Sequence, residues 1–147
     1  MRLYLDACCL NRLTDEPTQS RLRDEAEAVE RILGLISAGR ATWVSSAVLE
    51  VEVNRNPDSE RRRDVAVLFP FANAIVFPRQ AEAARAETLE KLGFGAFDAL
   101  HLACAEQGGV DVFLTTDDDL LRRARRHAAA LRIRVANPVS WYQEVTR

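Results

Sequence analysis

The sequence predicts an α/β fold in which a mostly parallel sheet lies between two layers of helices, a three-layer α/β/α arrangement. Short apolar segments alternate with longer segments of helical composition along the chain. This alternation is typical of parallel strands joined by crossover helices, which cover both faces of the sheet. With 147 residues, 48% of them hydrophobic, the chain is long enough to build its own core. We therefore expect a single domain over residues 1–147.

The chain begins with an apolar segment, Arg2–Leu5, which predicts a buried strand that ends at Asp6. Residues 18–37 then predict helical structure, either as one long helix or as two short ones. They have high helix propensity and carry apolar side chains three or four residues apart, and Gly39 follows as a stop signal.

Residues 41–44 predict the second strand. The serines after it, Ser45 and Ser46, offer an N-cap for a helix that runs to about residue 55. The dipeptide Asn56-Pro57 then breaks this helix.

The second half of the chain continues the alternation, with glycines before residue 96 as a break between two helices. We predict helices at 58–68, 79–92, 96–107 and 118–131, and strands at 74–77, 111–115 and 132–136.

Four acidic residues occupy positions that this fold would bring together. Asp6 and Asp117 follow strands, at the carboxyl ends where open parallel sheets bind ligands, and Glu52 and Asp98 interrupt apolar helix faces. Two carboxylates about 4 Å apart repel by roughly 4 kcal/mol at an effective dielectric of ~20, so a cation or raised pKa values must relieve such a cluster. Oxygen ligands without a Cys/His pattern favour Mg²⁺ or Mn²⁺. Phosphodiester hydrolysis is the chemistry most often built on such a site.

Asp98 is the most informative of these acids because its helix is apolar nearly all round. At 100° per residue Asp98 projects between Leu102 and Ala105, where an unpaired carboxylate is costly. The alternative is a structural role, in which a first-turn aspartate complements the helix dipole.

Glu50 and Glu52 compete for one position, because residues two apart lie on opposite faces of a helix. Glu50 shares its side with Ser46 and Asn54 and is expected to be solvated. Glu52 lies on the apolar side, so we predict Glu52 as the ligand and keep Glu50 as the reserve.

The remaining two ligands have structural alternatives as well. Asp6 could be a turn residue at the end of its strand. Asp117, Asp118 and Asp119 open a helix, where one of them is expected as the N-cap and the others favour the positive end of the dipole. We predict Asp117 as the ligand, since it is nearest the strand, with Asp119 as possible support.

Other polar residues near these positions are given structural roles. His101, one turn after Asp98, is interpreted as a hydrogen-bonded packing residue and left out of the catalytic set. The arginines at 61–63 and at 122, 123, 125 and 126 could line a nucleic-acid path, but charge runs on helices usually solvate a face.

The net charge and the cysteines restrict the possible functions less than the acidic residues do. The net charge of −2 argues against a protein that grips nucleic acid over its whole surface. Cys8, Cys9 and Cys104 are an odd number, with two adjacent, so we expect no disulfide framework and a reducing cytoplasm. The sequence has no apolar signal segment and no apolar span of about 20 residues, so we expect a soluble protein that is neither exported nor bound to a membrane.

Four motifs together resemble the PIN-domain ribonucleases, and more narrowly the VapC toxins of bacterial type II toxin-antitoxin pairs. They are YLDACCL with Asp6, VSSAVLEVEV with Glu52, FDALHLACAE with Asp98 and FLTTDDDLL with Asp117, and they span almost the whole chain in order. One departure concerns Ala7 and Cys8, which stand where many relatives have a threonine and then a serine or asparagine.

The resemblance implies a five-stranded parallel sheet and metal-dependent endonucleolytic cleavage of RNA. Asp6, Glu52, Asp98 and Asp117 would hold Mg²⁺ or Mn²⁺ as catalytic and metal-binding residues. It also implies a homodimer and a cognate VapB-like antitoxin that blocks the acidic site. The target, whether tRNA, rRNA or mRNA, is left open.

Two other functions remain compatible with the sequence. A non-catalytic PIN domain that binds RNA or protein would explain the altered residues Ala7 and Cys8. A small α/β phosphatase would also place an aspartate after the first strand, with further acids at other strand ends.

Overall fold

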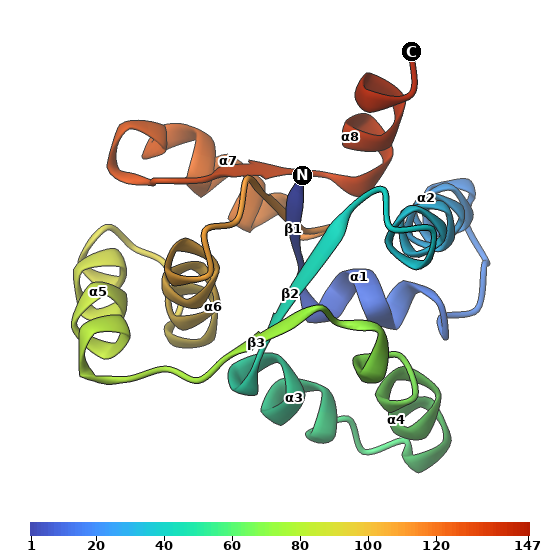
Figure 1. Ribbon diagram of the computed structural model, residues 1–147, viewed down its shortest axis with the longest axis horizontal. Helices are drawn as coiled ribbons and strands as arrows, with labels where there is room; N and C mark the ends of the chain where they lie inside the picture. Colours follow the sequence, from blue (N-terminus) through green and yellow to red (C-terminus); the bar gives the residue numbers. More distant parts are fainter.

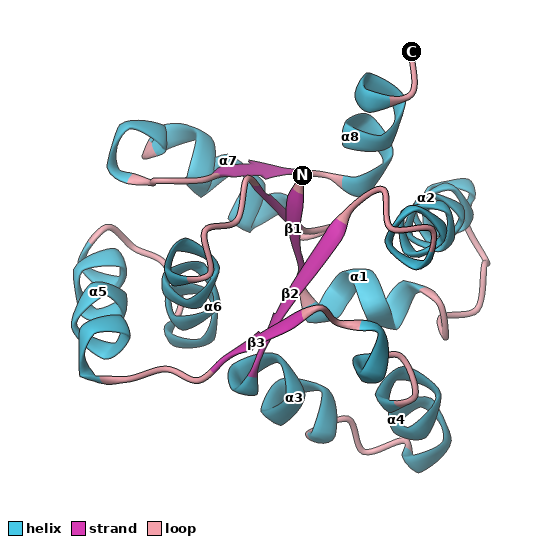
Figure 2. Ribbon diagram, in the orientation of Figure 1, coloured by secondary structure: helices cyan, strands magenta, loops and turns pink.

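The computed structural model describes residues 1–147 and contains one five-stranded sheet in which every pair of neighbouring strands is parallel. Figures 1 and 2 show helices on both sides of this sheet, so the predicted three-layer α/β fold is confirmed. The strand order is β3-β2-β1-β4-β5. The strands are β1 (Arg2–Leu5), β2 (Thr42–Ser46), β3 (Ala74–Val76), β4 (Val112–Leu114) and β5 (Arg134–Ala136).

The central position of β1 determines where the predicted ligands lie. Leu3 of β1 is in register with Trp43 of β2 on one side and with Val112 of β4 on the other. Because all strands are parallel, the residues that follow β1, β2 and β4 emerge at the same edge of the sheet. Asp6 and Asp117 therefore belong to one edge, as predicted.

Alternation along β1 divides the core into two layers. Leu3 and Leu5 are fully buried in one apolar cluster, which also contains Trp43 and Trp141. Tyr4 points to the opposite face and is buried in a second cluster. Both faces of β1 are thus covered, which is typical of parallel sheets.

The helices follow the predicted order, with additions and one correction. They are α1 (Ala7–Arg12), α2 (Ser20–Ser37), α3 (Ala47–Asn54), α4 (Ser59–Ala66), α5 (Gln80–Lys91), α6 (Ala96–Gln107), α7 (Asp118–Arg126) and α8 (Pro138–Val145), with 3₁₀ turns at Phe69–Phe71 and Ala128–Ala130. The prediction that the helix after Asp117 extends to residue 131 was wrong. After Ala124 the side chains are exposed or half-buried, so no packing prolongs α7.

Two helices were not predicted. α1 has six residues and begins at its N-cap Asp6, whose side chain accepts a hydrogen bond from the Ala7 N–H. α8 begins with Asn137 as N-cap and Pro138 at the first position, a recognised start signal. Cys8 and Cys9 lie on α1.

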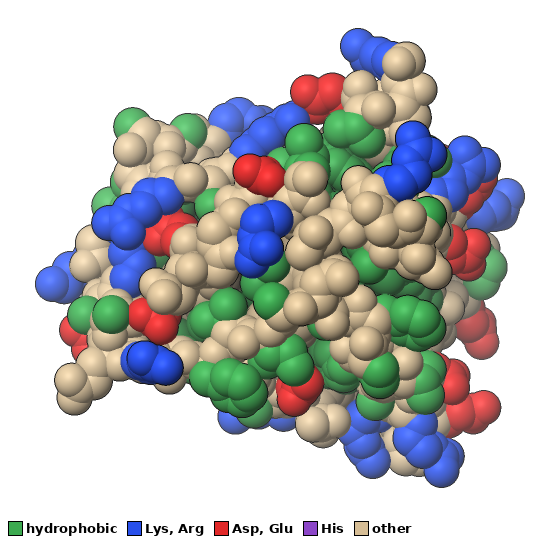
Figure 3. Space-filling model, viewed as in Figure 1, with side chains coloured by type: hydrophobic (Ala, Val, Ile, Leu, Met, Phe, Trp, Pro, Cys, Tyr) green, Lys and Arg blue, Asp and Glu red, His purple; other side chains and the backbone are tan.

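The surface in Figure 3 carries acidic and basic side chains intermixed, in keeping with the small net charge. Several apolar side chains are exposed near the edge strand β3, among them Phe71, Ile75 and Phe77. All three cysteines are free thiols. None of the helices combines the length and the apolar character that a membrane span requires.

Candidate metal centre

Asp6 is a buried carboxylate with both oxygens held by donors. It lies between β1 and α1, and only 4% of its surface is exposed. Oδ1 accepts from the Ala7 N–H at 2.9 Å, and Oδ2 accepts from the Thr115 hydroxyl at 2.8 Å and from the Cys8 thiol at 3.4 Å. Burial raises the pKa of Asp6, although these donors oppose the rise. The hydroxyl missing at residues 7 and 8 is thus supplied by Thr115, directly after β4.

Glu52 is fixed by a chain of short hydrogen bonds that crosses the sheet. Its Oε2 lies 2.7 Å from His101 Nε2, and His101 Nδ1 lies 2.6 Å from the Tyr4 hydroxyl. The Tyr4 hydroxyl in turn lies 2.6 Å from Ser46 Oγ, which accepts from the Leu49 N–H as the N-cap of α3.

This chain satisfies every member when the imidazole is neutral. Ser46 then donates to Tyr4, Tyr4 donates to His101 Nδ1, and His101 donates from Nε2 to Glu52. Burial lowers the pKa of His101, but the hydrogen bond to Glu52 and the nearby acids outweigh burial and raise it. His101 and Tyr4 therefore hold Glu52 in one orientation.

Asp6, Glu52 and His101 offer ligand atoms that all lie within 4.8 Å of one another, which is close enough to share one cation. The sequence interpretation excluded His101 from the site, whereas the structure places its ring in this group. Its hydrogen-bonding role, however, agrees with that interpretation. The partner Tyr4 is distant in sequence, and no local pattern reveals the pairing.

Asp98 lies in the first turn of α6 with its carboxylate half-buried and free of hydrogen-bond donors. Burial raises the pKa of Asp98 to about 6, and the charges of Asp6 and Asp117 add to the rise. Glu52 raises it further, while His101 opposes the shift. Asp98 is therefore within electrostatic reach of the three other predicted ligands, although it lies outside the 4.8 Å group.

Asp117 is exposed and serves as the N-cap of α7. Its Oδ1 accepts from the N–H groups of Asp119 at 2.9 Å and Leu120 at 3.2 Å. The aspartates that follow it have other partners, since Asp118 pairs with Arg21 and Asp119 with Arg122. Of this triple, Asp118 has both carboxylate oxygens engaged by Arg21, whereas Asp117 and Asp119 each keep one oxygen without a partner. Only Asp117 is free of an arginine partner.

Glu50 is separated from the other acids. It lies in a surface groove with Asn54, Phe69 and Ile75, on another side of α3 from Glu52. The helix-face argument therefore placed the two glutamates correctly relative to each other.

A model of the PIN domain family matches residues 3–126. The chain belongs to the PIN domain family.

Solved structures share the fold of this PIN domain at low sequence identity. FitAcB from Neisseria gonorrhoeae matches with a TM-score of 0.60 and 16% identity over 92% of this chain and 97% of that chain. VapBC2 from Rickettsia felis, in a structure bound to a DNA fragment from their promoter, matches with a TM-score of 0.60 and 13% identity. The match covers 93% of this chain and 98% of that chain. VapBC-1 from nontypeable Haemophilus influenzae matches with a TM-score of 0.60 and 17% identity over 94% of this chain and 98% of that chain. Comparison with curated protein sequences gives no match.

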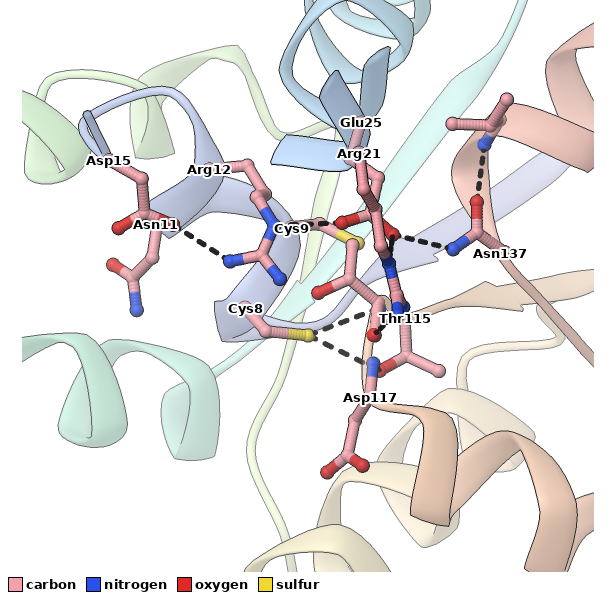
Figure 4. A network of polar contacts seen from close by, with 12 residues as sticks. Cys8, Cys9, Asn11, Arg12, Asp15, Arg21, Glu25, Thr115, Asp117 and Asn137 are labelled. Atoms are coloured by element: carbon pink, nitrogen blue, oxygen red, sulfur yellow. Dashed lines mark hydrogen bonds and ion pairs between the residues drawn. The ribbon is translucent and has the colours of Figure 1, made fainter. Parts of the chain in front are cut away.

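Behind the carboxylates, the PIN domain has a buried ionic network centred on Glu25 of α2 (Figure 4). Glu25 accepts from Arg12 Nε at 2.9 Å, from Arg21 Nε at 3.4 Å and from Asn137 Nδ2 at 2.8 Å. Arg21 also donates to both oxygens of Asp118 at 2.7 Å and to the carbonyl of Thr116 at 3.2 Å. The network thereby fastens α1, α2 and α8 to the turn that carries Asp117.

The basic clusters of the PIN domain divide into paired and unpaired arginines. Arg61 pairs with Asp15 and donates to the Thr14 hydroxyl, and Arg62 donates to the Asn56 carbonyl, so both serve local structure. On α7, three exposed arginines have no acidic partner: 123, 125 and 126. The exposed, unpaired arginines of these clusters therefore lie mainly on α7, with Arg63 on α4.

Tyr4→Phe is expected to destabilise the PIN domain by about 1–3 kcal/mol, because it leaves Ser46 and His101 without a buried partner. Urea denaturation of the metal-free protein measures this change. Tyr142→Phe is the control, since its half-exposed hydroxyl makes no hydrogen bond and should change stability by less than about 0.5 kcal/mol. Equal stability of the two variants would refute the hydrogen-bonded chain.

Proposed function

We propose that this PIN domain is a Mg²⁺- or Mn²⁺-dependent endoribonuclease that acts as the toxin of a toxin-antitoxin pair. The observation that carries the proposal is the carboxylate cluster. Asp6 and Glu52 lie within 4.8 Å of each other, and Asp98 has a pKa raised to about 6 with no donor to stabilise its charge. Such a cluster is electrostatically unfavourable unless a cation neutralises it.

The donor set fits a hard divalent cation. Asp6, Glu52, Asp98 and Asp117 offer carboxylate oxygens, which Mg²⁺ and Mn²⁺ prefer. Both nitrogens of His101 are already engaged, by Tyr4 and Glu52, so we assign it to holding Glu52 rather than to ligation. The thiol of Cys8 lies beside Asp6, but it is engaged in hydrogen bonds with Asp6 and Thr115, so we do not assign it as a metal ligand.

When bound, such a cation supplies positive charge for the scissile phosphate and lowers the pKa of a nucleophilic water. The residues of the chain prepare the site for it. Thr115 and the Ala7 N–H fix Asp6, and His101 fixes Glu52, so neither carboxylate must reorient when substrate arrives. Asp98 has no such donor, so its charge is left uncompensated by hydrogen bonds.

Two further parts of the proposal concern partners. The motifs resemble those of VapC toxins, and the fold is that of the VapBC structures, which supports a VapB-like antitoxin as partner. The exposed apolar side chains Phe71, Ile75 and Phe77 near the edge strand β3 support a homodimer. The free thiols suit the cytoplasm. Light scattering of purified protein, with and without Phe77→Glu, tests the dimer.

Cleavage of total cellular RNA by purified protein tests the nuclease. Discrete fragments are expected with Mg²⁺ or Mn²⁺ and none with EDTA. Calorimetric titration of the cation is run in parallel. Cation binding without cleavage of any RNA would replace the nuclease with a non-cutting RNA or protein binder, and hydrolysis of a generic phosphomonoester would indicate a phosphatase.

The pKa of Asp98 predicts how cation binding varies with pH. A proton on Asp98 competes with the cation. The rise in melting temperature caused by Mn²⁺ should therefore be largest above pH 7 and become smaller as the pH is lowered through 6. In the metal-free protein, the stability contributed by Asp98 changes with pH in the opposite direction. The folded state holds this proton more tightly than the unfolded state, so Asp98 lowers stability as pH rises from about 4 to about 6.

Thermal denaturation at several pH values, with and without Mn²⁺, measures both effects. The difference between wild type and Asp98→Asn isolates this group from other titrating residues. A Mn²⁺ effect that does not vary between pH 5 and 8 would contradict the assignment of Asp98 as a ligand.

A further inference from the structure

Arg55 and Phe97 form an exposed pair at the rim of the carboxylate cluster. Arg55 ends α3, one turn after Glu52, and Phe97 lies in the first turn of α6, directly before Asp98. The guanidinium carbon of Arg55 lies 4.8 Å from the centre of the Phe97 ring, within the range of a cation–π contact. Arg55 is exposed and Phe97 is half-buried.

This pair lies outside another contact between α3 and α6. The inner contact joins Glu52 to His101, which is fully buried. Phe97 is one turn before His101, and their ring centres lie 6.4 Å apart. The position of Phe97 relative to the predicted ligands is therefore fixed by the same helices that hold Glu52.

Arg55 has no acidic partner, as is also true of the three unpaired arginines of α7. Arg12, Arg21 and Arg122 each form an ion pair with a carboxylate. The side chain of Arg55 makes neither an ion pair nor a hydrogen bond, although Glu52 lies on the same helix. Its contact within the protein is with the ring of Phe97. Its N–H donors remain free for a ligand.

The guanidinium of Arg55 lies over the Phe97 ring, and the Arg55 side chain is exposed to solvent. Single-stranded RNA is recognised through bases that stack on aromatic rings or on arginine guanidinium planes, and base–aromatic stacking tolerates different bases. The free N–H groups at the edge can bind phosphate in a fixed geometry. Both properties suit a nucleotide beside a cleavage site.

We propose that Arg55 and Phe97 form a base-stacking subsite for an unpaired nucleotide adjacent to the scissile phosphate. This inference rests on the proposed nuclease function and adds a pair of substrate-positioning residues to it. The subsite requires the target to be unpaired at that nucleotide, since a base within a duplex has no free face. The ordinary alternative is that the pair only joins α3 to α6, in which case RNA would be unaffected by its loss.

The test uses single-stranded RNA of about 12 to 15 nucleotides, a length within the ~4–16 nucleotides that single-strand binding grooves typically cover. The fluorescent base 2-aminopurine is placed at each position in turn. The metal-free protein is used so that no cleavage occurs. Stacking quenches the fluorescence of this base, and anisotropy of an end-labelled RNA gives the affinity. Wild-type protein is expected to quench a restricted set of positions, and Phe97→Leu and Arg55→Gln to abolish the quenching and weaken binding about tenfold.

Three further variants separate stacking from charge and from folding. Phe97→Tyr retains the ring and should restore quenching, whereas Arg55→Lys keeps the charge but loses the planar group and should not. Arg40→Gln is the charge-matched control, because Arg40 precedes β2 at the opposite edge of the sheet and should bind RNA like wild type. Melting temperatures of all variants identify any that unfold.

The outcomes distinguish this subsite from the nuclease itself. Quenching that depends on Arg55 and Phe97, without cleavage under any metal condition, would retain the subsite and remove the proposed activity. Cleavage with unchanged KM, cut sites and quenching in Phe97→Leu and Arg55→Gln would overturn the subsite and retain the nuclease. An absence of quenching by wild type, or full quenching by Arg55→Lys, would also overturn it.

Discussion

Asp98→Asn is expected to lower the rate of RNA cleavage by more than about 100-fold, since changes even to residues that only support metal ligands typically cost 10- to 100-fold. The substitution keeps the shape of the side chain but removes the charge that has no donor to stabilise it. The metal-free variant should be at least as stable as wild type, because one repelling and partly desolvated carboxylate is gone. Loss of activity together with retained stability is the signature of a ligand rather than of a structural residue.

Single-turnover cleavage and thermal denaturation with and without Mn²⁺ measure these effects. Glu87→Gln is the matched control, because Glu87 is an exposed acid of α5 without an ion pair. It should change neither the rate nor the response to Mn²⁺. A variant Asp98→Asn with wild-type cleavage would exclude Asp98 from the metal site and leave Asp6, Glu52 and Asp117 as the remaining candidate ligands.

Glu25→Ala is expected to lower the free energy of unfolding by roughly 3 kcal/mol, a large share of the ~5–15 kcal/mol typical of folded domains. Glu25 is buried, and its loss leaves Arg12 and Asn137 without their acceptor. Arg12 retains Asp15, and Arg21 retains Asp118, which limits the loss. The melting temperature should fall by about 6–12 °C.

Glu27→Ala on the same helix is the control for this substitution. Glu27 pairs with Arg31 at an exposed position, one turn along α2, so its removal should cost about 0.5 kcal/mol or less. Equal destabilisation by the two substitutions would show that the buried network adds nothing beyond helix surface charge. A lower affinity for Mn²⁺ in Glu25→Ala is also expected, since Arg21 then loses one of the contacts that position the turn before α7.

The fold was predictable because its signals are local. Each strand is a short apolar segment, and each long helix has the appropriate spacing and an end signal such as Gly39 or Asn56-Pro57. α1 was missed because it has only six residues and because its N-cap, Asp6, was interpreted solely as a ligand. α8 could have been predicted, since Asn137 and Pro138 are a known start signal.

The candidate site was predictable only in part. Strand direction predicted that Asp6 and Asp117 share one edge of the sheet, and helix geometry separated Glu52 from Glu50. The hydrogen bonds that hold these acids in place were not predictable. The hydrogen bond from Thr115 to Asp6 joins residues 109 positions apart, and the bond from Tyr4 to His101 joins residues 97 apart. Such contacts follow from strand order, which no local pattern encodes.

The central position of β1 also sets the time at which the carboxylate cluster can exist during synthesis. Asp6 leaves the ribosome more than 100 residues ahead of the donor Thr115, which follows β4. At about 5–20 residues per second, this interval is on the order of 10 s. Until β4 pairs with β1, the chain has neither the bond that holds Asp6 nor Asp117 near it. A fragment that ends before β4 lacks Thr115 and Asp117, so the carboxylate cluster can assemble only after these residues have been made.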